Sequence, residues 1–89
     1  MYDYIKYNKK EKMPDGFDAT GKSFQTYDLI HKNMAGFEIT KDNKLFSNGK
    51  DMFFHGEIDI CISGDDKIFR DYRVKFTDGI LQSIIVLNS

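Results

Sequence analysis

Residues 68–87 read IFRDYRVKFTDGILQSIIVL and contain the clearest structural signal in the chain. Asp78-Gly79 is a dipeptide typical of a two-residue type I′ turn. The runs on either side are rich in β-branched and aromatic residues, which favour strands. Such a turn predicts the cross-strand pairs Thr77–Ile80, Phe76–Leu81, Val74–Ser83 and Tyr72–Ile85. These pairs gather apolar residues of both strands on one face, so the sequence predicts an antiparallel hairpin.

Working outward, residues 53–62 alternate between apolar and polar positions, as expected of a strand with one face on a core. The strand after Asp78-Gly79 differs, because it is apolar on both sides. Its second side carries Ile80, Ile84 and Val86. We therefore expect that strand to be covered on both faces or to pair in a homodimer.

Three further elements are predicted from weaker signals. Asp42-Asn43 indicates a type I′ hairpin within residues 37–46, with Ile39 and Phe46 on the core face. Residues 2–7 form a plausible strand, and residues 9–21 form a polar loop with a turn at Asp15-Gly16. Between residues 25 and 36 the pattern predicts a short helix that begins at Asp28.

The composition indicates a folded chain with much β structure. Of 89 residues, 40% are hydrophobic and 15% aromatic, with eight Phe and five Tyr. Aromatic side chains suit a pleated, half-buried surface. We predict an α+β fold that is mainly β: one compact domain over residues 1–89, with a small antiparallel sheet of about five or six strands and one short helix.

Charge, cysteine count and motifs exclude several functional classes. A net charge of −1 indicates neither a broadly basic nucleic-acid coat nor an acidic mimic of DNA. The single cysteine, Cys61, and the lack of a long apolar segment predict a cytoplasmic protein that does not enter a membrane. Phosphate-binding, zinc-hydrolase and nucleophile-elbow motifs are missing. We therefore expect no enzyme activity and no cofactor.

The candidate protein-binding residues cluster in an acidic part of the chain. Residues 51–66 hold five acidic side chains and no Lys or Arg, an asymmetry that can steer a basic partner. We select Phe53, His55, Glu57, Asp59 and Tyr27 as candidate contacts. His55, Glu57 and Asp59 alternate along one strand, so their side chains can converge on one metal ion only if a second structural element cooperates. A solvated face explains these residues better, and we predict no metal site.

The N-terminal stretch supports nucleic-acid binding as an alternative function. It mixes rings that can stack on bases with cations that can bind phosphates. The candidate residues are Tyr4, Lys6, Tyr7, Lys9, Lys10 and Lys12. An edge strand protected by lysines explains the same residues, and the signatures of the common nucleic-acid-binding folds are missing.

The segments Ser23–Leu29 and Phe37–Thr40, Phe54–Ile58 with its glycine, and Phe76–Gly79 together resemble a loose family of small uncharacterised proteins from bacteria and their phages. The resemblance covers most of the chain from Ser23 onward, but Tyr27 and Asn43 depart from its pattern. It implies a cytosolic accessory protein, encoded by a phage or mobile element, and it transfers no functional residue. Together with the residue patterns, it leads us to expect a non-enzymatic protein that binds and modulates a host protein.

Overall fold

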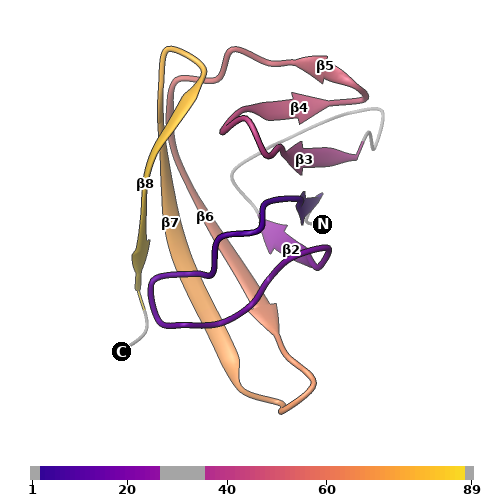
Figure 1. The fold of residues 1–89 in the computed structure, drawn as a ribbon, viewed down its shortest axis with the longest axis vertical. Helices are drawn as coiled ribbons and strands as arrows, with labels where there is room; N and C mark the ends of the chain where they lie inside the picture. The colour runs from indigo at the N-terminus through magenta and orange to yellow at the C-terminus, as the bar shows by residue number, and fades with distance from the viewer. Residues whose placement is uncertain (1–2, 27–35, 88–89) are drawn as a thin grey trace.

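The structure, a computed structural model, describes residues 3–26 and 36–87, which form one eight-stranded sheet (Figure 1). The strands are β1 (Asp3–Tyr7), β2 (Ser23–Thr26), β3 (Phe37–Ile39), β4 (Leu45–Ser47), β5 (Lys50–Asp51), β6 (Gly56–Ser63), β7 (Phe69–Thr77) and β8 (Ile80–Val86). Their order in the sheet is β5-β4-β3-β1-β2-β6-β7-β8. Only β1 and β3 pair in parallel, and every other neighbouring pair is antiparallel.

The mainly antiparallel sheet confirms the larger part of the predicted fold class. The strand count is a correction, because eight strands form where five or six were expected, and no helix lies among the described residues. Of the predicted helical segment, Gln25 and Thr26 belong to β2, and residues 27–35 lie outside the described residues. None of the described residues forms a helix long and apolar enough to cross a membrane.

Strand β5 has a sequence signal that the pattern analysis missed. Asn48 and Gly49 have φ values of 54° and 80°, and Ser47 pairs with Lys50 across them. Positive φ at both central residues is the requirement of a type I′ turn, and Asn-Gly is a strong signal for it. The dipeptide alone therefore predicts the hairpin of β4 and β5.

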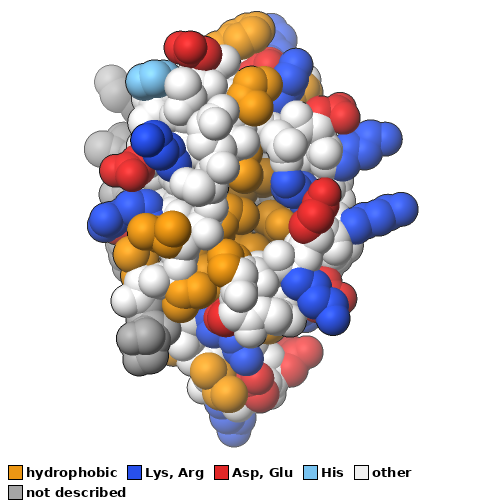
Figure 2. All heavy atoms as spheres, turned by 60° about the vertical axis from the view of Figure 1, so that its left-hand side comes forward, with side chains coloured by type: hydrophobic (Ala, Val, Ile, Leu, Met, Phe, Trp, Pro, Cys, Tyr) orange, Lys and Arg blue, Asp and Glu red, His pale blue; other side chains and the backbone are white. Residues whose placement is uncertain are grey.

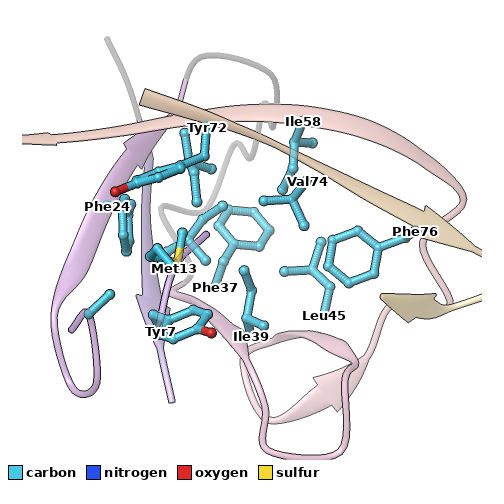
Figure 3. Close-up of a cluster of buried hydrophobic side chains, with 13 residues drawn as sticks. Tyr7, Met13, Phe24, Phe37, Ile39, Leu45, Ile58, Tyr72, Val74 and Phe76 are labelled. Atoms are coloured by element: carbon cyan, nitrogen blue, oxygen red, sulfur yellow. The ribbon is translucent and has the colours of Figure 1, made fainter. Parts of the chain in front are cut away.

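One hydrophobic core joins the two halves of the sheet (Figure 3). Its buried members are Ile5, Tyr7, Met13, Ala19, Phe24, Phe37, Ile39, Leu45, Ile58, Ile60, Tyr72, Val74 and Phe76. They come from six strands that span most of the sheet and from the loop between β1 and β2. Because one cluster receives side chains from strands far apart in the order, the sheet must curve around it. The amide of Leu81 donates to the Asn43 carbonyl (2.7 Å) and ties β8 to the turn between β3 and β4.

Three aromatic rings pack together in this core. The ring of Phe24 meets the rings of Tyr7 and Tyr72 edge to face, at centroid distances of 6.3 and 5.9 Å. Both tyrosine hydroxyls find acceptors in the loop, since Tyr72 donates to the Asp15 carboxylate and Tyr7 to the Glu11 carbonyl. Burial, followed by the contact with Asp15, raises the pKa of Tyr72 well above its ordinary value. The β1–β2 loop is thereby fixed over the core.

The hairpin of β3 and β4 forms as predicted, but its register differs by one residue. Thr40 exchanges a hydrogen bond with Lys44, and only Asn43 has positive φ (65°) among the loop residues. The connection is therefore a three-residue loop ending in a left-handed residue, not a type I′ turn. Ile39 consequently pairs with Leu45, and Leu45 rather than Phe46 faces the core.

The hairpin of β7 and β8 is confirmed at its turn and corrected beyond it. Asp78 and Gly79 both have positive φ (50° and 87°), and Thr77 pairs with Ile80 and Phe76 with Leu81. A β-bulge at Gln82 then shifts the register. The pairs that follow are Lys75–Ser83, Val74–Ile84, Arg73–Ile85 and Tyr72–Val86. The bulge turns Ile84 and Val86 toward the core, where the two-residue turn alone had placed Ser83 and Ile85.

Candidate functional site

The free edge of β8 is the first part of the candidate site. β8 is the last strand of the sheet and has seven residues, whereas β5 at the opposite edge has two. The Leu87 amide donates to the Asp71 carbonyl (3.0 Å), so hydrogen-bonded pairs recur at Ile85 and Ser83. The main-chain groups of Ile84 and Val86 therefore point away from β7. Among the described residues, no hydrogen bond occupies these two amides.

Apolar side chains lie beside this edge on the face that points away from the core, here called the outer face. Ile85 and Leu87 are 50% and 36% exposed, and Phe69 and Ile80 are 53% and 40% exposed. Figure 2 turns the β8 side forward and shows orange side chains on this side of the molecule, with charged side chains around them. The sequence pattern missed Ile85 and Leu87, because the bulge that exposes them has no glycine to mark it.

The predicted acidic contacts Glu57 and Asp59 do project from the outer face of β6, but basic residues of β7 face them. Arg73 Nε and an Nη of Arg73 lie 2.8 and 3.2 Å from the two carboxylate oxygens of Asp59. Glu57 pairs in register with Lys75. The acidic run in the sequence is therefore largely neutralised by its neighbour strand, and the surface is mixed in charge.

Phe53 and His55 lie at a different place, beside the turn between β7 and β8. Phe53 is 73% exposed, precedes β6 and has a φ of 49°. The Asp78 amide donates to Nδ1 of His55 (3.0 Å), and the Gly79 amide donates to the Phe54 carbonyl (2.9 Å). Figure 1 shows this approach at the top of the long strands. The fifth predicted contact, Tyr27, lies outside the described residues.

The six candidate nucleic-acid residues also separate. Tyr4 and Lys6 project outward from β1, and Lys10 and Lys12 are exposed on the loop. Tyr7 is buried in the core, and Lys9 is only 7% exposed, with its Nζ donating to Asn43 Oδ1. The remaining four therefore do not form one stacking surface with these two.

Lys9 and Lys10 line a cleft of about 650 Å³ beside β3 and β4. Its charged residues balance in sign, because Lys9, Lys10 and Lys41 are matched by Glu11, Glu38 and Asp42. Glu38 also accepts a hydrogen bond from Asn8 (2.7 Å). The cleft thus has no excess of positive charge to attract a phosphate backbone.

A second, smaller pocket of about 180 Å³ lies on the outer face. A row of paired residues lies beneath it: Gln25 of β2, Cys61 of β6, Asp71 of β7, and Leu87 directly after β8. Phe69 forms part of the pocket wall. Burial is the main cause that raises the pKa of the Cys61 thiol, and the nearby Asp71 carboxylate adds to it. Among the described residues, no group of three or more His, Cys, Asp and Glu side chains is placed to hold a metal.

The Cys61–Asp71 contact gives a measurable pH effect. Asp71→Asn removes the negative charge, so the pKa of Cys61 should fall, while burial keeps it above its ordinary value. The ultraviolet absorbance of the thiolate, followed against pH, measures this change. Asp65→Asn removes a fully exposed carboxylate and serves as the control. An unchanged Cys61 pKa in Asp71→Asn would show that the two side chains do not interact.

The structure thus brings together an unpaired strand edge, exposed apolar side chains and a small acidic pocket on one side of the molecule. No known protein family, curated protein or solved structure matches the chain.

Proposed function

We propose that the protein is a non-enzymatic binding module that pairs the free edge of β8 with an extended segment of another protein. The observation that carries this proposal is that the amides of Ile84 and Val86 point away from β7 and take part in no hydrogen bond within the described part of the chain. An incoming strand forms backbone hydrogen bonds with such an edge and gains specificity from alternate side chains.

The surroundings of the edge support the same function. An added strand lies about 4.8 Å from β8, so its outward side chains contact Ile85 and Leu87. Its inward side chains cover Ile84 and Val86, which are only partly buried. Both sides of the incoming segment thus remove apolar surface from water, at about 25 cal/mol per Å².

The sequence resemblance supports a bacterial host protein as the partner of a phage-encoded modulator. This part of the proposal rests on the resemblance alone. The acidic residues selected from the sequence have a lesser role in it, since Arg73 and Lys75 face them across the sheet.

Proline at position 86 tests the edge directly. Val86→Pro removes the outward amide without removing a hydrogen bond to β7, a position at which edge strands tolerate proline. Val86→Ala is the matched control, because it removes similar packing and keeps the amide. Random dodecapeptides displayed on yeast are selected against the natural chain, and the binding of the enriched peptides is measured for all three proteins.

We expect the enriched peptides to bind the proline variant at least about tenfold more weakly than the alanine variant. Amide hydrogen exchange at Ile84 and Val86 should slow when such a peptide is bound. Equal binding to both variants would exclude strand addition at β8. A dimer of the natural chain that Val86→Pro dissociates would instead assign the edge to pairing with a second copy.

A further inference from the structure

The small pocket on the outer face holds a polar atom that has no partner within residues 3–26 and 36–87. This atom is Asp71 Oδ1, which is buried and accepts no hydrogen bond from that part of the chain. Among the described residues, no Lys, Arg or His forms an ion pair with Asp71. A buried carboxylate oxygen without a donor is unfavourable, because it has lost its water and gained nothing in return.

The two arginines of β7 nearest to Asp71 in the sequence interact with other side chains. Arg73 forms its two-point contact with Asp59, and Arg70 binds Asp66 and lies 4.3 Å from the ring centroid of Phe17, on the core side of β7. The negative charge of Asp71 is therefore available to a donor from outside the described part of the chain.

The walls of the pocket restrict what that donor can be. Phe69 and Leu87 are exposed apolar side chains at its rim, and they suit an alkyl stem. The Phe69 ring also attracts a cation that lies over its face. A volume of about 180 Å³ admits one narrow group, and an ammonium on a slender alkyl stem fits it better than the planar two-point fork of a guanidinium.

We propose that this pocket binds an alkylammonium group, supplied by a lysine side chain of the segment that pairs with β8. The inference rests on the proposed function, because it needs a strand beside β8. Such a strand lies two strand spacings, roughly 10 Å, from β7. An extended lysine on its outer side crosses Leu87 and brings Nζ to Asp71.

Two small probes test the contribution of the ammonium charge separately from that of the alkyl stem. Nα-acetyl-lysine N-methylamide carries the ammonium, and Nα-acetyl-norleucine N-methylamide has an alkyl side chain without it. Each is titrated into the ¹⁵N-labelled chain, and the amide resonances of Cys61, Asp71 and Leu87 are followed. We expect saturable shifts with the lysine probe and at least about tenfold weaker binding of the norleucine probe. Asp71→Asn should abolish this preference, whereas Asp65→Asn should keep it.

Equal shifts from both probes, or an unchanged preference in Asp71→Asn, would overturn the proposal. n-Butylammonium distinguishes a free amine from a peptide-borne lysine: tighter binding of the free amine would overturn the assignment to a partner's side chain. In an enriched peptide, replacing the lysine opposite Leu87 with norleucine should weaken binding about tenfold.

These experiments distinguish a failure of the ammonium-pocket proposal from a failure of the strand-addition proposal. The small probes do not use the strand edge, so Val86→Pro should leave their binding unchanged. If the peptides bind without a preference for lysine, the pocket assignment is wrong and strand addition stands. If the probes bind but no peptide depends on residue 86, the edge assignment is wrong and the ammonium pocket stands without its strand.

Discussion

Phe24→Ala should lower the free energy of unfolding by about 3–5 kcal/mol. The Phe24 side chain is fully buried between the rings of Tyr7 and Tyr72, which project from β1 and β7. Its removal leaves a cavity where two distant strands meet, and it takes away both edge-to-face contacts. Because a small domain is stable by only about 5–15 kcal/mol, the variant should lose a large part of its stability.

The same substitution on the surface is the control. Phe69 is 53% exposed, so Phe69→Ala should change the free energy of unfolding by less than about 1 kcal/mol. Urea unfolding followed by circular dichroism compares the two variants with the natural chain. Phe24→Leu, which keeps most of the volume, gives a measurable transition even if Phe24→Ala does not fold. Similar losses for Phe24→Ala and Phe69→Ala would contradict the described core.

Gly79→Ala should have the second largest effect, a loss of about 2–4 kcal/mol. The φ of Gly79 is +87°, and a Cβ atom there would lie 3.1 Å from the Cα atom of Phe53. Left-handed backbone is strained for alanine, and a backbone neighbour cannot rotate aside as a side chain does. The substitution also strains the hydrogen bond from the Gly79 amide to Phe54.

Gly49 separates these two causes. Its φ is +80°, but a Cβ atom would meet nothing within 4 Å. Gly49→Ala should therefore cost about 1–2 kcal/mol, through backbone strain alone. Thermal unfolding of both variants measures the difference. Equal losses would mean that Phe53 does not approach the turn as closely as described.

The sequence predicts the turns of this fold better than the register that follows them. Asp78-Gly79 is identified by its dipeptide, since few residues accept two successive positive φ values. Gln82, by contrast, has no property that marks a bulge, and the exposure of Ser83 or Ile84 depends entirely on it. At Asn43 the left-handed residue is predicted, but not the extra loop residue that puts Leu45 in the core.

The candidate site was less predictable for a related reason. The acidic character of Glu57 and Asp59 is visible in the sequence, whereas the opposing Lys75 and Arg73 depend on strand pairing. Likewise, Asp71 Oδ1 lacks a donor among the described residues because of how the strands are assembled, which no short segment reveals. These electrostatic contacts are set by the pairing of strands in the assembled sheet, so no single segment of sequence predicts them.

The place of β2 in the strand order also has a consequence for synthesis of the chain. β2 lies between β1 and β6. One of its edges can therefore pair only after Ile60 and Cys61 of β6 have been synthesised. In a ribosome-bound chain that ends before these residues, β2 can pair with β1 but its other edge has no partner, and Phe24 lacks its contact with Tyr72. This long-range pairing should delay folding relative to the local hairpins. We expect the nascent chain to be most prone to aggregation, and most dependent on chaperones, in that interval.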